Sequence, residues 1–176
     1  MPARTADPVE LLILRHAKSD WTRDCDDFDR PLNKRGRRDA PRMGAWLAAH
    51  DLMPDRVLSS PARRARQTVE AVSEALHIPA GRILWDERLY LAGLPLLLDI
   101  LAETPPEIRR LLLVGHNPGL EDLLVHLAGG PLPQNPDDKL LPTASVARLR
   151  LRGWRQLQKG AAELVQRIRP RDLPGN

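Results

Sequence analysis

The sequence predicts an α/β fold, a three-layer α/β/α sandwich on a mostly parallel sheet with one antiparallel edge strand. Short apolar runs typical of fully buried strands occur at residues 9–14, 56–59 and 111–114. Each run precedes a segment whose apolar residues recur at helical spacing. Residues 145–152 instead alternate apolar side chains with arginines, which is typical of an antiparallel strand with one solvated face. Buried strands that alternate with amphipathic helices indicate the sandwich.

The first strand ends at Arg15 and His16, and the polar stretch at 18–31 is expected to be a loop. A helix is predicted from about residue 33 to residue 50. Its buried face carries Ala40, Met43 and Leu47.

The second strand, 56–59, leads into a helix that is predicted to begin at Ser60 and Pro61. Serine is a favoured N-cap and proline suits the first helical position. A short extended piece at 83–85 and a short helix at 94–101 follow. The inner stripe of the helix after Pro61 consists of Ala65, Val69, Val72 and Leu76.

The third strand, 111–114, ends in the sequence GHNP, in which Asn117 and Pro118 repeat the pattern of a cap followed by proline. Residues 129–142 are expected to form a loop. A last helix is predicted over 154–168, and the tail after it is expected to fray. Helical spacing relates Leu120, Leu123, Leu124 and Leu127 in the helix after Pro118, and Trp154, Leu157, Ala161, Leu164 and Ile168 in the last one.

Length and composition favour one domain, residues 1–176, with a core at about 9–169 and flexible tails. The chain is 42% hydrophobic and 28% charged, which argues against disordered, fibrous and membrane classes. The start lacks the apolar segment of a secretory signal, so a cytoplasmic location is expected. The single cysteine, Cys25, lies in an acidic run that disfavours a thiolate, so it is not a candidate nucleophile.

Polar side chains follow three of the predicted strands, at Arg15–His16, Ser59–Ser60 and His116–Asn117. The carboxyl ends of parallel strands meet at one edge of a sheet, so these groups are expected to share a crevice. Two of the junctions open helices, whose N-termini favour an anion such as phosphate. Arg64, in the first turn of its helix, leans back toward the crevice, where it and Arg15 can clamp a phosphoryl group.

His16 is the candidate nucleophile, because a neutral imidazole attacks phosphorus and a phosphohistidine divides one difficult displacement into two easier ones. Nearby arginines disfavour protonation of its ring. His116 can donate hydrogen bonds to the transferred oxygens. Glu87 is the best carboxylate candidate for protonating the leaving group.

Five segments also carry a family resemblance. Residues 14–17 (LRHA) resemble the Arg-His-Gly signature of histidine phosphatases, apart from Ala17 in place of glycine, and 30–36 (RPLNKRG) are similar to the segment that follows it. Residues 59–68 (SSPARRARQT) resemble the block with the second arginine, and 114–118 (VGHNP) resemble the block with the second histidine. Residues 87–90 (ERLY) resemble the acid segment, which is the least specific. Over about residues 10–150 the chain is identified as a member of this superfamily, with a phosphoglycerate mutase-like fold.

The sequence RHAKS, the short chain and the sequence LPTAS at 141–145 resemble the SixA-type phosphohistidine phosphatases. The resemblance implies that His16 is the nucleophile, that Arg15, Arg64 and His116 form the phosphate pocket, and that Glu87 donates the proton. It implies no metal and no cofactor. The expected partner is a protein that carries phosphohistidine, or a small phosphorylated metabolite.

Simpler interpretations compete for several of these residues. An arginine-rich helix is usually a solvated face, and helical phase alone separates Arg64 from Arg63 and Arg66. Glu87 can equally be a surface carboxylate. Ser19, Ser60 and Asn117 are possible phosphate contacts, but helix capping explains Ser60 and Asn117 nearly as well. His50, His77 and His126 are expected at helix boundaries.

Two other functions are compatible with the sequence. One is a small-molecule phosphomonoesterase or a phosphoglycerate mutase-like enzyme, although only about 20 residues separate Thr68 from Glu87 and about 30 separate Glu87 from His116, which leaves little chain for a lid. The other is a nucleic-acid-binding module that uses the arginines at 148–155 and 63–66. The net charge of +4 permits such binding, but no nucleic-acid motif supports it, so neither nucleic acid nor membrane is an expected partner.

Overall fold

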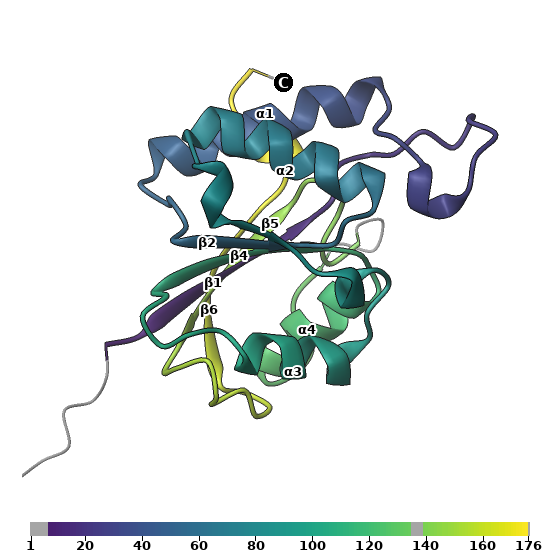
Figure 1. Ribbon diagram of the computed structural model, residues 1–176. Helices are drawn as coiled ribbons and strands as arrows, with labels where there is room; N and C mark the ends of the chain where they lie inside the picture. Colours follow the sequence, from purple (N-terminus) through teal and green to yellow (C-terminus); the bar gives the residue numbers. More distant parts are fainter. Residues whose placement is uncertain (1–6, 135–138, 176) are drawn as a thin grey trace, which may run out of the picture.

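The computed structural model describes residues 7–134 and 139–175, in which a twisted sheet lies between two layers of helices (Figure 1). The sheet order is β3-β2-β4-β1-β5-β6. Strands β1 to β4 are mutually parallel, and β5 pairs antiparallel with both β1 and β6. The strands are β1 (Val9–Arg15), β2 (Arg56–Ser59), β3 (Ile83–Trp85), β4 (Arg110–Gly115), β5 (Val146–Leu151) and β6 (Ala162–Ile168).

Helices α1 and α2 cover one face of the sheet, and α3 and α4 cover the other (Figure 1). This arrangement confirms the predicted α/β/α sandwich. None of the described helices is long and apolar enough to cross a membrane. The helices are α1 (Lys34–Ala49), α2 (Arg63–Leu76), α3 (Leu94–Ala102) and α4 (Gly119–Ala128), with 3-10 turns η1 (Asp27–Asp29), η2 (Ala80–Arg82), η3 (Glu87–Leu89) and η4 (Pro170–Asp172).

Strand β1 lies inside the sheet and is buried on both faces, which explains why its sequence is apolar apart from Glu10 and the terminal Arg15. Leu11 and Ile13 belong to the core beneath α3 and α4. Leu12 and Leu14 belong to the core beneath α1 and α2. With helices packed on both faces of the sheet, the polar carboxyl end of β1 has a fixed position in the fold.

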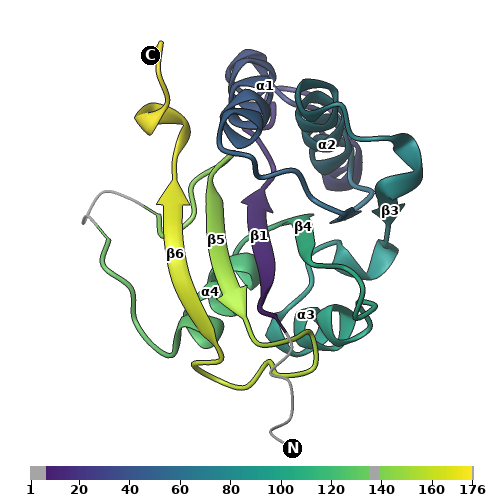
Figure 2. The ribbon, with the colours of Figure 1, turned by 90° about the vertical axis from the view of Figure 1, so that its left-hand side faces the viewer.

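The predicted last helix at 154–168 is wrong. Residues from Trp154 onward form turns, and Ala162–Ile168 is strand β6, which pairs with β5 at one edge of the sheet (Figure 2). Gly160, at a φ of 77°, breaks the segment in a conformation that glycine favours. Pairing with β5, which otherwise exposes a free edge, outweighs the helical spacing. The antiparallel strand β5 therefore lies one position inside the edge predicted for it.

Two predicted helix starts also shift. Helix α2 begins at Arg63 with Ala62 as its N-cap, and α4 begins at Gly119 after Pro118, neither with a side-chain cap. Ser60 and Asn117 are therefore not N-caps, although Oγ of Ser60 accepts a hydrogen bond of 3.3 Å from the backbone N–H of Ala62, just before α2.

The C-terminal tail does not fray over its whole length as predicted. Leu173 is only 5% exposed. Its carbonyl oxygen accepts a hydrogen bond of 3.3 Å from Nη2 of Arg42, on α1. The start of the N-terminal tail, residues 1–6, lies outside the described residues.

Candidate active site

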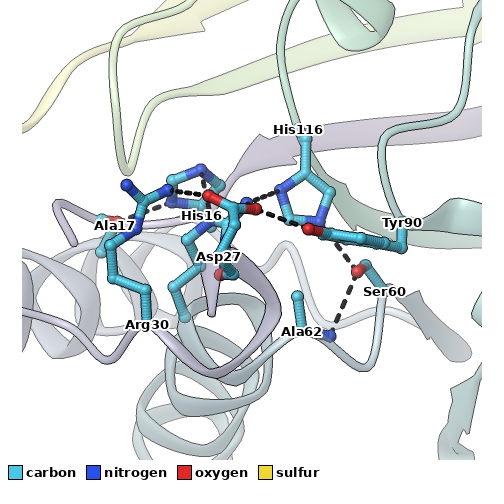
Figure 3. Close-up of polar contacts among 9 residues, drawn as sticks. His16, Ala17, Asp27, Arg30, Ser60, Ala62, Tyr90 and His116 are labelled. Atoms are coloured by element: carbon cyan, nitrogen blue, oxygen red, sulfur yellow. Dashed lines mark hydrogen bonds and ion pairs between the residues drawn. The ribbon is translucent and has the colours of Figure 1, made fainter. Parts of the chain in front are cut away.

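The polar residues predicted to share a crevice converge at the carboxyl ends of β1, β2 and β4. His16 directly follows β1, Ser60 follows β2 and His116 follows β4. All three are buried, and the two imidazole rings lie with their centroids 5.2 Å apart. Figure 3 shows this cluster with the side chains that surround it.

The contacts of His16 define which of its ring nitrogens can react. Nδ1 lies 2.7 Å from the carbonyl oxygen of Ala17, which can only accept, so Nδ1 carries the proton. Nε2 faces Nε of Arg64 at 3.4 Å and accepts from it. The lone pair of His16 is therefore on Nε2, beside a guanidinium.

His116 has the opposite tautomer. Nη2 of Arg64 lies 3.3 Å from Nδ1, and because a guanidinium only donates, Nδ1 is the acceptor. Nε2 therefore carries the proton and donates to Oγ of Ser60 at 2.8 Å. The same Oγ of Ser60 accepts the backbone N–H of Ala62, so it links His116 to the start of α2.

Both rings are uncharged near neutral pH. Burial holds the pKa of His16 well below its usual range; the hydrogen bond to Ala17 opposes this, and the nearby positive groups lower the pKa further. Burial and the charge of Arg64 lower the pKa of His116 to about 3. Only a neutral imidazole has a lone pair for attack, so His16 is in its nucleophilic form.

Arg64 is the central cation of the site and is only 2% exposed. Besides both histidines, it donates to the carbonyl oxygen of Asp27 at 2.6 Å and to Oδ2 of Asp27 at 3.0 Å. Its neighbours point elsewhere, because Arg63 is exposed and the guanidinium of Arg66 lies 4.3 Å from the ring centroid of Trp85. The structure thus places Arg64 as helical phase predicts, although α2 begins later than expected.

Arg15 approaches from β1 and is partly buried. Nη1 donates to the carbonyl oxygen of Leu141 at 3.2 Å, while Nε is buried without a partner in the described part of the chain. Burial lowers the pKa of the Arg15 guanidinium; the negative charge of Glu121 opposes this, and the charge of Arg64 adds to it. The site therefore concentrates positive charge at a place suited to a phosphoryl group.

Asp27, Arg30 and Tyr90 belong to the site, but the sequence analysis did not single them out. Oδ1 of Asp27 accepts from Arg30 at 2.6 Å, and Oδ2 accepts from the Tyr90 hydroxyl at 2.6 Å (Figure 3). Burial raises the pKa of Asp27, but Tyr90, Arg64 and Arg30 together lower it below its usual range. One signal in the sequence could have indicated Asp27: it lies three residues before Arg30, the first residue of the matched block at 30–36.

Glu87 is not part of these contacts. It lies on η3 and is exposed, and its carboxylate makes no hydrogen bond or ion pair with residues 7–134 or 139–175. The same turn leads to Tyr90, whose hydroxyl does reach the site. The role of Glu87 as proton donor stays a prediction.

Ala17, the departure from the glycine signature, fits without displacing the nucleophile. Its backbone N–H donates to Oγ1 of Thr68 at 2.9 Å. Its methyl group packs in a small cluster with Leu32, Ala40 and Ala144. The extra carbon is therefore buried in this cluster, between the segment after β1 and helix α1.

The remaining histidines lie at helix ends, as expected. His50 and His77 are the C-caps of α1 and α2, and His126 is in the last turn of α4. Ser19 is buried and pairs through its backbone with Leu32. Nδ2 of Asn117 donates to the carbonyl oxygen of Leu141, beside Arg15.

Comparisons with known proteins agree with this geometry. The model of the histidine phosphatase superfamily (branch 1) matches residues 11–89. The chain is 35% identical over 158 residues to the uncharacterized protein Rv1276c of Mycobacterium tuberculosis, a match that covers 86% of this chain and 96% of that protein. It is 27% identical over 144 residues to the phosphohistidine phosphatase SixA of Escherichia coli, covering 81% and 86% of the two chains.

A solved structure gives the same result. A crystal structure from Agrobacterium tumefaciens, assigned by name to the phosphohistidine phosphatase SixA, superposes with a TM-score of 0.78 and 31% sequence identity. The match covers 93% of this chain and 99% of that one. The fold is therefore shared across nearly the whole chain.

Proposed function

Because the chain belongs to the histidine phosphatase superfamily and is of the SixA type, we propose that this phosphatase removes phosphoryl groups from phosphohistidine in proteins. The observation that carries the proposal is the neutral His16 ring, with its Nε2 lone pair held beside Arg64 in a pocket lined by cations. This is the environment that nucleophilic attack on a phosphoryl group requires.

In the first step, Nε2 of His16 attacks phosphorus and forms an N–P bond while the bond to the leaving group breaks. The leaving group departs with the bonding electron pair and takes up a proton. Arg15 and Arg64 neutralise the charge on the transferred oxygens. The Nε2 proton of His116, which donates to Oγ of Ser60 in the free site, turns to one of these oxygens when the phosphoryl group is bound. The proton on Nδ1 stays with the carbonyl oxygen of Ala17.

In the second step, water attacks the phosphohistidine and the electron pair of the N–P bond returns to Nε2. The products are inorganic phosphate and the free imidazole of His16. The water proton passes to a base at the pocket. Glu87, which the sequence predicts as the proton donor of the first step, is one candidate to take this proton back. Asp27, which contacts Arg64 and Tyr90, is the other.

A phosphohistidine substrate suits this site because its leaving group makes small demands on the enzyme. A protonated phosphoimidazole expels a neutral ring, whereas an alkoxide leaves poorly without a proton. The exposed position of Glu87 and the depressed pKa of Asp27 both favour a substrate of the first kind. The expected partner is a cytoplasmic phosphoprotein.

The test is a steady-state comparison of kcat/KM for three substrates: a histidine-phosphorylated protein, a phosphoserine peptide and 3-phosphoglycerate. We expect the first to be preferred by at least tenfold. His16→Ala is the inactive control, and His126→Ala, which changes a histidine at a helix end, is its matched control. Preference for 3-phosphoglycerate would replace the proposal with a small-molecule phosphatase or a phosphoglycerate mutase-like enzyme.

A further inference from the structure

Three aromatic side chains, Trp21, Phe28 and Tyr90, are connected by ring contacts to residues of the phosphate pocket, and we call them the aromatic rim. Trp21 is 73% exposed and Phe28 is 38% exposed. Aromatic residues make up only 3% of the chain, and Phe28 and Tyr90 are its single phenylalanine and its single tyrosine. The single phenylalanine and the single tyrosine of the protein therefore lie at its active site, and Trp21 and Phe28 are exposed to solvent.

The rim is continuous with the phosphate pocket through direct contacts. The Phe28 ring meets Tyr90 edge to face at a centroid separation of 5.0 Å, and Tyr90 meets His116 in the same way at 5.6 Å. On the other side, the guanidinium carbon of Arg30 lies 3.4 Å from the ring centroid of Trp21. Arg30 in turn contacts Asp27. A substrate held in the pocket therefore has aromatic surface next to it.

Folding gives no reason to expose these rings. A side chain that is 73% exposed contributes little buried area, and exposed apolar surface beside a ligand site is typical of an interaction surface. Tryptophan and tyrosine are also the residues that most often dominate binding energy at interfaces. A small metabolite ends within a few atoms of its phosphoryl group and does not extend over the whole rim, whereas a polypeptide carries flanking side chains on both sides of the modified residue.

We propose that the aromatic rim is the docking surface for the polypeptide that presents the phosphorylated histidine. The imidazole, bonded directly to phosphorus, lies beside Tyr90 and His116, and the side chains that flank it pack on Trp21 and Phe28. This inference rests on the proposed function and deepens it, because it assigns the recognition of protein substrates to two residues outside the phosphate pocket.

The test compares a large and a small substrate that both contain an N–P bond, a histidine-phosphorylated protein and phosphoramidate. We expect Trp21→Ala and Phe28→Ala to raise KM for the phosphoprotein about tenfold, which corresponds to roughly 1.4 kcal/mol of binding free energy. Values of kcat, and of kcat/KM for phosphoramidate, should stay within about twofold of wild type. Trp21→Phe, which keeps an aromatic ring over Arg30, should restore most of the affinity.

Val165→Ala is the matched control, because Val165 is 36% exposed on β6, away from the site. This substitution should leave KM and kcat unchanged for both substrates. Equal losses on both substrates would mean that the rim shapes the phosphate pocket through Arg30, and would overturn the docking role. Unchanged kinetics on both would overturn it as well. A wild-type enzyme that does not hydrolyse the phosphoprotein would instead refute the proposed function, and the rim proposal with it.

Discussion

Nδ1 of His16 donates a hydrogen bond of 2.7 Å to the carbonyl oxygen of Ala17, the residue that follows it. The backbone of Ala17 is itself fixed by its hydrogen bond to Thr68 on α2. A backbone carbonyl group, that of Ala17, and not a carboxylate, therefore sets the tautomer of the proposed nucleophile. This arrangement makes the function of His16 depend on the packing of α2 against the end of β1.

Arg64→Ala should lower kcat/KM at least about a hundredfold, because this guanidinium contacts both histidines and the loss of one preorganised donor costs that much in other active sites. Arg64→Lys should recover little, since one ammonium does not replace four directed N–H···acceptor contacts. Arg63→Ala and Arg66→Ala are the controls, and each should stay within about threefold of wild type. Equal losses in all three alanine variants would indicate a diffuse basic surface.

Glu87→Gln and Asp27→Asn separate the two candidate proton donors. If Glu87 acts in catalysis, Glu87→Gln should slow hydrolysis of a phosphoserine peptide strongly and of a phosphohistidine protein only mildly, because the alkoxide needs the proton more. The ratio of the two losses in kcat is the measurement. If Asp27→Asn shows that ratio and Glu87→Gln does not, the donor is Asp27. Equal large losses of kcat on both substrates would contradict the idea that only the alkoxide leaving group needs a proton from the enzyme.

Stability should fall as the pH drops below about 6.5. The pKa of His116 is lowered to about 3 by burial, so between these values the unfolded chain binds a proton that the folded chain does not. Well below pH 6.5 the free energy of unfolding falls by about 1.4 kcal/mol per pH unit for this residue alone, and the loss between pH 6.5 and pH 5 is about 1.6 kcal/mol. Urea unfolding at both pH values should show this loss in wild type and a smaller one in His116→Asn. A pH slope that is unchanged in this variant would contradict the buried neutral state.

Gly119→Ala should destabilise the protein by about 1–3 kcal/mol, the usual cost of overpacking. A Cβ at this position would lie 1.9 Å from the carbonyl oxygen of Ala92, a backbone atom that moves only with the loop after Tyr90. Gly81→Ala is the control, because a Cβ there meets nothing within 4 Å. Thermal unfolding should separate the two variants, and equal midpoints would mean that the loop adapts freely.

The sequence predicted the centre of this fold better than its edge. Strands β1 and β4 are buried on both faces, so their apolar sequences admit few other structures, and the polar residues at their ends mark the pocket. Strand β6 was mistaken for a helix because its identity depends on pairing with β5, which local periodicity does not contain. Asp27 lies in a polar loop and contacts Arg64 only because of the path that this loop takes. The pattern of apolar residues does not predict the path of a polar loop.

The central claim, that His16 accepts the phosphoryl group, is tested most directly by trapping the phosphoenzyme. Wild type incubated briefly with labelled substrate and quenched in alkali should retain a label that is stable to base and lost in acid, as expected of phosphohistidine. His16→Ala should keep its fold, carry no label and show no turnover, whereas His126→Ala should be labelled like wild type. A label of the same stability on the His16→Ala protein would show that another residue is the acceptor.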